Sequence, residues 1–213
     1  HHRWLDLKII NNSNIIPKTI YFDDYCDSDN KSDIILNSSP CITNKSYEIS
    51  DKQTLISGAN AVIIDKIFLK IRKLNVKNTF NFPPKNILLN LGFQPSKISV
   101  KLWINALFDF FKDVKIEVNV GPIFINENFC LIDSKKYKDK LRILPFVENS
   151  EDFYRKFDLV VGNCGINSVE RSVAGIPSIN VLVGEKQKNN YNFLKKNKAL
   201  VFKHENNTNE ISI

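Results

Sequence analysis

Several residue types that often mark a function are scarce or absent in this chain of 213 residues. It contains no methionine, only three histidines and only seven glycines. No apolar run approaches the ~18 residues that a membrane-spanning helix needs, and no signal-peptide pattern is present. Neither a Gly-x-Gly-x-x-Gly nor a Gly-x-x-x-x-Gly-Lys-Ser/Thr pattern occurs. The sequence therefore predicts no membrane span, no ordinary dinucleotide site and no P-loop.

The absence of methionine indicates where this sequence starts relative to its translational start. A chain without methionine does not begin at its own translational start, and the leading pair His1-His2 is typical of a tag remnant. We therefore expect a fragment or a trimmed chain.

The four cysteines are widely spaced along the sequence, at Cys26, Cys41, Cys130 and Cys164. They form no Cys-x-x-Cys pair and no Cys/His pattern of the zinc type. This spacing predicts free thiols in a reducing cytoplasm, with no metal site and no cofactor. Cys164 has no histidine beside it in the sequence, so we interpret it as a small residue that fills a tight turn.

The net charge of +7 arises from 30 basic and 23 acidic residues. Such an excess is compatible with a polyanionic partner. The alternative, which we favour, is that the whole sequence is rich in Lys, Asn and Ile without a functional reason. The lysines are scattered along the chain, as this alternative predicts. Aromatic residues are not interleaved with them as in nucleic-acid-binding segments, so no nucleic-acid partner is predicted.

Short apolar runs alternate with helical patterns along most of the chain. The spacing of Val100, Trp103, Ile104, Leu107 and Phe111 predicts a helix over 97–112 with one buried face, and places Trp103 in the core. Apolar runs predict strands at Thr19–Phe22, Asp33–Asn37, Ile87–Leu91, Val114–Val120 and Leu141–Pro145. Strands that alternate with helices predict a parallel, doubly wound sheet.

The most informative stretch runs from Asp158 to Asn190. It predicts a strand at Leu159–Val161, a turn at Gly162–Gly165, a helix from Asn167 or Ser168 to Gly175, and a strand at Ile179–Val183. The free N–H groups at the start of such a helix attract a phosphate. Glu170 is expected in the first helical turn, where its carboxylate would bind ribose hydroxyls and favour the helix by ~0.3–1 kcal/mol.

The segment GNCGINSVERSVAGIPSINVLVGEKQ resembles the nucleotide-binding segment of GT-B nucleotide-sugar enzymes. It is closest to the UDP-sugar hydrolases of pseudaminic acid biosynthesis and is also similar to the peptidoglycan lipid-intermediate glycosyltransferase. Cys164 replaces a usual glycine and Lys186 a usual asparagine. The matching residues are Gly162, Gly165, Glu170, Arg171, Gly175, Pro177, Glu185 and Gln187.

The resemblance implies a GT-B-like α/β fold, with a doubly wound parallel sheet in the C-terminal domain and the remainder of a truncated N-terminal α/β domain. The expected boundaries are 1–68 for the end of the N-terminal domain, 69–84 for a linker, 85–204 for the nucleotide-binding domain and 205–213 for a tail. Asn81-Phe82-Pro83-Pro84 supports the linker, because prolines interrupt regular elements.

The resemblance also implies a substrate, UDP or a UDP-sugar, and roles for individual residues. Gly165, Asn167 and Ser168 would hold the diphosphate, and Glu170 the ribose. The remaining substrate-binding residues that it implies are Gly92 near the sugar or phosphate, Phe146 and Val147 near the uracil, and Glu185 and Gln187 near the sugar or phosphate edge.

The N-terminal part resembles the same hydrolases less closely. In IYFDDYCDSDNKSDIILN, the pair Asp23-Asp24 follows a strand as in that family. These carboxylates are either acid/base groups or metal ligands, or they cap a strand end and a turn, and we favour the capping role. In SGANAVIIDKIF, Gly58 and Phe68 match the family, while Ala61 and Asp65 replace a usual tyrosine and arginine.

The general base of these hydrolases is a histidine in a glycine-rich loop near the start of the N-terminal domain. This chain has only His1, His2 and His204. We therefore expect this chain alone to be inactive. Three hypotheses remain open: a UDP-sugar hydrolase, a UDP-sugar-dependent glycosyltransferase and a non-catalytic nucleotide-sugar-binding relative.

Overall fold

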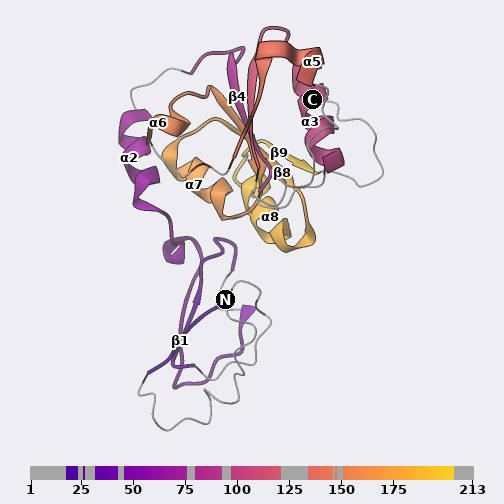
Figure 1. The fold of residues 1–213 in the computed structure, drawn as a ribbon. Coiled ribbons are helices and arrows are strands. Elements are labelled where there is room, and N and C mark those ends of the chain that lie inside the picture. Colours follow the sequence, from indigo (N-terminus) through magenta and orange to yellow (C-terminus); the bar gives the residue numbers. More distant parts are fainter. Residues whose placement is uncertain are drawn as a thin grey trace. The chain divides into compact units, whose positions relative to one another are not determined.

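A computed structural model describes residues 18–23, 26, 32–42, 46–75, 80–92, 97–120, 134–145, 147 and 151–203 (Figure 1). The chain divides into two compact units, with the boundary between Ile63 and Ile64.

Unit 1 contains a parallel sheet of three short strands. These are β1 (Ile20–Phe22), β2 (Ile34–Asn37) and β3 (Thr54–Ser57), in the order β1-β2-β3, followed by the 3₁₀ turn η2 (Ala59–Ala61). The strands predicted at Thr19–Phe22 and Asp33–Asn37 are confirmed. The sequence did not predict β3, whose four residues provide too short an alternating pattern.

Unit 2 contains a parallel sheet of six strands in the order β6-β5-β4-β7-β8-β9. The strands are β4 (Asn86–Asn90), β5 (Lys115–Asn119), β6 (Leu141–Leu144), β7 (Leu159–Asn163), β8 (Ser178–Leu182) and β9 (Val201–Lys203). The doubly wound parallel sheet that the sequence predicts is therefore confirmed.

Helices cover both faces of this sheet, as Figure 1 shows. One face packs against α3 (Lys97–Phe110), and the other against α2 (Lys66–Asn75), α6 (Glu151–Tyr154) and α7 (Ile166–Ala174). The remaining described elements are α5 (Ser134–Tyr137), η3 (Lys138–Lys140), η4 (Glu185–Gln187) and α8 (Lys188–Lys196). In β4, Ile87 and Leu89 face α3 while Leu88 faces α2, because side chains alternate along a strand.

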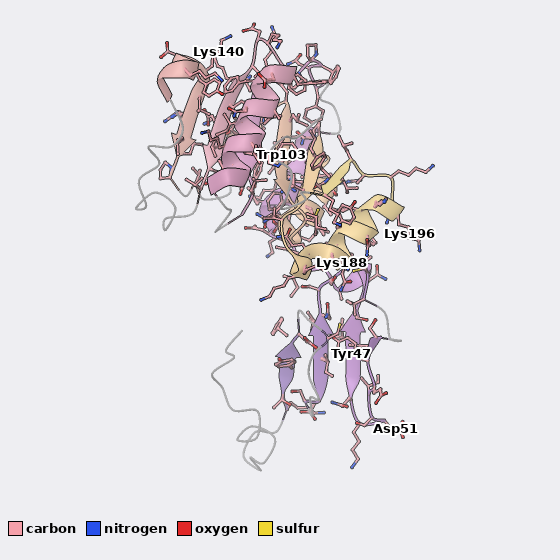
Figure 2. All side chains as sticks on the ribbon, turned by 90° about the vertical axis from the view of Figure 1, so that its right-hand side faces the viewer. Tyr47, Asp51, Trp103, Lys140, Lys188 and Lys196 are labelled. Atoms are coloured by element: carbon pink, nitrogen blue, oxygen red, sulfur yellow. The ribbon has the colours of Figure 1, made fainter. Side chains whose placement is uncertain are left out.

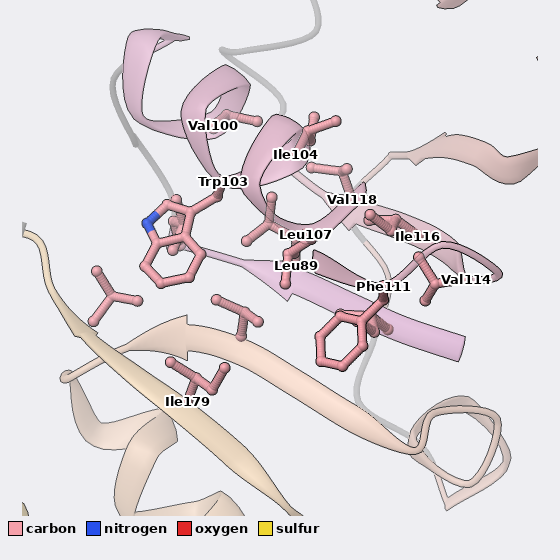
Figure 3. Packing of buried hydrophobic residues seen from close by; sticks show 14 of the residues in the cluster. Leu89, Val100, Trp103, Ile104, Leu107, Phe111, Val114, Ile116, Val118 and Ile179 are labelled. Atoms are coloured by element: carbon pink, nitrogen blue, oxygen red, sulfur yellow. The ribbon is translucent and has the colours of Figure 1, made fainter. Parts of the chain in front are cut away.

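The main core lies between α3 and the sheet (Figure 3). Trp103, Ile104 and Leu107 are fully buried there, as the helical spacing predicts. The ring of Trp103 meets Phe202 of β9 edge to face, with centroids 5.2 Å apart. Trp103 is thus a core residue and contributes nothing to a binding surface.

The first part of the predicted linker at 69–84 is helical in the structure. Residues 69–75 belong to α2, whose Phe68 and Ile71 are buried against the sheet. Basic residues alternate with apolar ones there, so the helical spacing of the apolar residues is hard to recognise in the sequence. The division into an N-terminal domain, a linker and a C-terminal domain otherwise stays a prediction.

The order of the strands reverses between β4 and β7. The chain leaves β4 towards β5 on one side and leaves β7 towards β8 on the other. The connecting helices α3 and α7 therefore lie on opposite faces of the sheet. Doubly wound sheets usually bind their ligand at such a reversal point.

The end of α7 provides a stability prediction. Gly175 ends the helix with φ of 68° and ψ of 33°, a left-handed conformation that costs a residue with a Cβ atom about 1 kcal/mol or more. Gly175→Ala should therefore lower the free energy of unfolding by about 1 kcal/mol in urea titrations.

Gly184→Ala is the matched control. Gly184 has an extended backbone, with φ of −160°, and an added Cβ would meet nothing within 4 Å. Alanine there should be neutral or stabilise by about 0.4–1 kcal/mol. Equal losses in the two variants would show that the left-handed backbone of Gly175 does not matter.

Candidate functional site

The candidate site consists of the turns that follow β4 and β7 at the reversal point. Asn90 of β4 pairs with Gly162 of β7, so the two strands end side by side. Gly92 follows β4 with φ of 104°, a backbone that favours glycine. The predicted site residues Gly92, Gly165 and Asn167 are thus brought to the same edge of the sheet.

The helix α7 begins one or two residues earlier than the sequence predicts. Gly165 is its N-cap, has an extended backbone and offers no side-chain cap. The first N–H groups of a helix have no acceptor within it. The N–H of Ser168 is bonded to the carbonyl of Gly165, at 3.0 Å, which leaves those of Ile166 and Asn167 for an anion.

Ser168 is fully buried inside this turn. Its hydroxyl donates to the carbonyl oxygen of Gly165 at 2.6 Å. The contact between Ser168 and a diphosphate that the sequence predicts stays a prediction. In the structure the residue shapes the turn from within.

Asn163 joins the two turns, a role that the sequence did not reveal. Its Nδ2 donates to the carbonyl oxygen of Leu91 at 3.2 Å, and its Oδ1 accepts from the N–H of Gly165 at 3.2 Å. Asparagine in a glycine-bearing turn was the only available signal, because the contact with Leu91 depends on the pairing of β4 with β7.

Arg171 lies beneath the turn and is only 2% exposed. Its Nη2 donates to the carbonyl oxygen of Asn163 and to Oδ1 of Asn180 on β8, both at 2.9 Å. The guanidinium lies against Gly162, where an added Cβ would come within 2.6 Å of Nη1. Burial lowers the pKa of Arg171 to about 10, so the side chain stays cationic at neutral pH.

Arg171 forms no salt bridge within 4 Å among the described side chains, although its charge interacts with that of Glu170, and its Nε has no hydrogen-bond partner there. The hydrogen bonds of the guanidinium go to neutral acceptors. A buried cation below the turn makes the electrostatic potential at the turn more positive, which favours an anionic ligand.

Glu170 lies in the second turn of α7, not in the first as predicted, because the helix begins at Ile166. It is 8% exposed. Burial raises the pKa of its carboxyl, and the Asp65 carboxylate raises it further. A hydrogen bond from the backbone of Asp65 and the charge of Arg171 lower the pKa in part. The stabilisation of the helix start by Glu170 is therefore not expected.

Cys164 is fully buried and packs against Leu182 and Leu194. Burial raises the pKa of its thiol to about 12, although the charge of Arg171 acts in the opposite direction. The thiol is therefore protonated at neutral pH and a poor nucleophile. This confirms the interpretation of Cys164 as a packed residue.

Glu185 and Gln187 follow β8, the neighbour of β7, and so approach the same edge of the sheet. Gln187 Oε1 accepts a hydrogen bond from the N–H of Val183 at 3.2 Å. Glu185 is exposed and pairs with Lys188 at 3.5 Å. Both roles at the sugar stay predictions.

The predicted base-recognition segment follows β6. Val147 is partly buried and packs beside the cluster between α2, α6 and the sheet. Phe146 lies outside the described residues, as do Phe93, Gln94 and Pro95 of the turn after Gly92.

Unit 1 carries a second polar cluster, at the ends of β1 and β2. Asp23 is fully buried and accepts hydrogen bonds from the Tyr47 hydroxyl at 2.9 Å and from the Cys26 N–H at 3.1 Å. Asn37 donates to the Tyr47 hydroxyl at 2.8 Å. Burial raises the pKa of Tyr47. These contacts favour the capping role of Asp23, and Asp24 lies outside the described residues.

The opposite edge of the unit 2 sheet also has a concavity. A hollow of about 400 Å³ lies before β4 and β5, lined by Asn81, Phe82, Pro83, Pro84, Lys85, Phe110, Phe111, Lys112 and Asp113. Figure 2 shows Lys140 at that end of the unit and Lys188, which follows β8, towards the other. The hollow has no cluster of polar groups at a helix start, so we place the site at the carboxyl edge.

The described residues contain no group of three or more His, Cys, Asp or Glu side chains placed to hold a metal ion. Within the same residues, no helix has the length and apolar character that crossing a membrane requires.

No family model matches the sequence. The uncharacterized protein MJ1062 of Methanocaldococcus jannaschii is 29% identical over 187 residues, which are 84% of this chain and 38% of that protein.

Among solved structures, MurG of Acinetobacter baumannii superposes with a TM-score of 0.55 at 16% identity, over 86% of this chain and 52% of MurG. The glycosyltransferase SnogD of Streptomyces nogalater gives a TM-score of 0.43 at 14% identity, over 81% of this chain and 44% of SnogD. The similarity to MurG shows that the chain has a GT-B-like α/β fold. It spans about half the length of MurG.

The raised pKa of Glu170 predicts how stability depends on pH. Because this pKa is higher in the folded than in the unfolded chain, the unfolded chain loses the proton first as pH rises. The stability that the protonated carboxyl contributes is therefore lost above about pH 4.3, the ordinary pKa of glutamate. Glu170→Gln cannot ionise, so its stability relative to wild type should rise with pH in urea titrations.

Glu185→Gln serves as the control, since that carboxylate is exposed and in an ion pair with Lys188. Its stability relative to wild type should not rise with pH. A Glu170→Gln variant that becomes less stable than wild type as pH rises would mean that the fold stabilises the ionised carboxylate.

Proposed function

We propose that this chain is the nucleotide-sugar-binding portion of a UDP-sugar hydrolase that acts in the biosynthesis of nonulosonic acid surface sugars. The observation that supports it most is the position of the 158–190 segment. The residues that resemble the hydrolases form the turn at the reversal point of a GT-B-like sheet, above a buried cation.

In this proposal the diphosphate lies at the start of α7. The N–H groups of Ile166 and Asn167 donate to its oxygens, and the helix dipole and the charge of Arg171 favour its negative charge. Gly165 and Gly92 lie in the two turns beside this position, where the phosphates and the sugar meet backbone groups.

The remaining predicted residues surround this position. Glu170 binds the ribose hydroxyls through its carboxylate. Main-chain groups at Phe146 and Val147 recognise the uracil, and Glu185 and Gln187 meet the edge of the sugar or the phosphate. The contribution of this chain is to bind and orient the nucleotide sugar, whose hydrolysis releases UDP.

A UDP-sugar-dependent glycosyltransferase is the second candidate, favoured by the structural similarity to MurG. The two reactions differ in what receives the sugar. A hydrolase releases UDP with water alone, whereas a transferase needs an acceptor molecule. A non-catalytic relative would bind the nucleotide sugar and release no UDP in either case.

The nucleotide preference tests the proposal directly. We expect UDP to bind more tightly than ADP or GDP in titration calorimetry. The reason is that the main-chain groups proposed to contact the base would match the hydrogen-bonding groups of uracil. The affinity should be weak if a second domain completes the site. Equal affinities for the three nucleotides would contradict the uridine assignment.

Glu170→Gln tests the ribose contact. A hydrogen bond to a charged group contributes ~1.5–3 kcal/mol, so this variant should bind UDP about tenfold more weakly. Because the pKa of Glu170 is raised, wild-type affinity should also fall as pH drops through that pKa, and the affinity of the variant should not.

Glu151→Gln is the control for UDP binding, since Glu151 lies on α6 and approaches Lys70 at 3.9 Å. It should bind UDP as wild type does. Unchanged UDP affinity in Glu170→Gln would remove the ribose assignment while leaving the diphosphate site in place.

A further inference from the structure

We propose that Asn163 is a positioning residue that combines the β4 turn and the β7 turn into one receptor for two adjacent phosphates. In this role it determines how strongly the site distinguishes a nucleoside diphosphate from a nucleoside monophosphate. The inference deepens the proposed function and depends on it.

The first observation is that one amide group serves both turns. Nδ2 of Asn163 donates to the carbonyl of Leu91, directly before Gly92, and Oδ1 accepts from the N–H of Gly165, directly before the helix. Both distances are 3.2 Å. A movement of either turn relative to the other therefore breaks one of these hydrogen bonds.

The second observation is steric. A Cβ atom on Gly92 would clash with Nδ2 of Asn163, and one on Gly165 would lie 3.1 Å from Oδ1. The amide thus fills the space between two glycines whose Cα atoms have no side chain. Gly92 also has a φ of 104°, which L residues rarely adopt.

The third observation concerns what holds Asn163 itself. Its carbonyl oxygen accepts a hydrogen bond from the buried Arg171 at 2.9 Å. The backbone and the side chain of Asn163 are therefore fixed independently, the first by a buried cation and the second by the two turns. Such preorganisation lowers the cost of ordering the site when a ligand binds.

The chemistry of the ligand follows from this arrangement. A monophosphate presents one phosphoryl group, which the N–H groups at the start of α7 can satisfy alone. A diphosphate presents two linked phosphoryl groups, and the Gly92 turn, which Asn163 holds beside the start of α7, is the neighbouring surface for the second. Loss of the amide should therefore weaken a diphosphate more than a monophosphate.

The test compares UDP with UMP, each titrated into the whole chain by calorimetry. In wild type UDP should bind more tightly than UMP. In Asn163→Ala the ratio of the two dissociation constants should fall about tenfold, since two hydrogen bonds that hold the turns together are lost. Asn197→Ala is the matched control, because Asn197 makes a side-chain bond to the backbone of Phe193 outside the site. It should leave the ratio unchanged.

Asn163→Asp provides a second variant in case the alanine variant does not fold. The carboxylate has the same shape and still accepts from Gly165, but it cannot donate to Leu91 and adds a negative charge beside the phosphates. The ratio should again fall, and at least as far.

A general structural role would not change this ratio, because loss of folded protein affects both nucleotides equally. If the Asn163 variants weaken UDP and UMP by the same factor, the positioning role is wrong. Wild-type protein that binds UDP no more tightly than UMP also overturns it, and leaves the proposed nucleotide site standing. Wild-type protein that binds neither nucleotide overturns the proposed function together with this inference.

Discussion

The buried guanidinium of Arg171 is the interaction on which the candidate site depends. It contacts Gly162 directly and binds the carbonyl of Asn163 on β7 and the side chain of Asn180 on β8. A buried charge without partners costs several kcal/mol, so these acceptors must stay in place. The turn above Arg171 is therefore fixed before any ligand arrives, and the cation beneath it favours an anion.

Elements with a strong local pattern were predicted well from the sequence. The helix 97–112 appears as Lys97–Phe110, because its apolar residues recur with a regular helical spacing. The strands β4 to β8 lie within one or two residues of their predicted positions, since each is a short apolar run. The glycine that ends α7 was also identified correctly, since Gly175 adopts the left-handed backbone.

Features that depend on tertiary contacts were not predictable in this way. The helix α2 was missed because basic residues alternate with its apolar ones, and two of these, Phe68 and Ile71, are buried by contacts with the sheet. The helix start was shifted because Asn167 and Ser168 are good caps in isolation, whereas the hydroxyl of Ser168 donates inward to Gly165. The role of Asn163 depends on the pairing of β4 with β7, which no local pattern encodes.

The most direct test of the account is to map UDP on the chain by the chemical shifts of its backbone amides. The account predicts that UDP shifts the amides of Gly92, Gly165, Ile166 and Asn167, where β4 and β7 end. The amides of Phe110 to Asp113, beside the hollow on the opposite edge, should not move. Shifts confined to that hollow, or no shifts at the start of α7, would contradict the central claim that this helix start and the Gly92 turn form the nucleotide site.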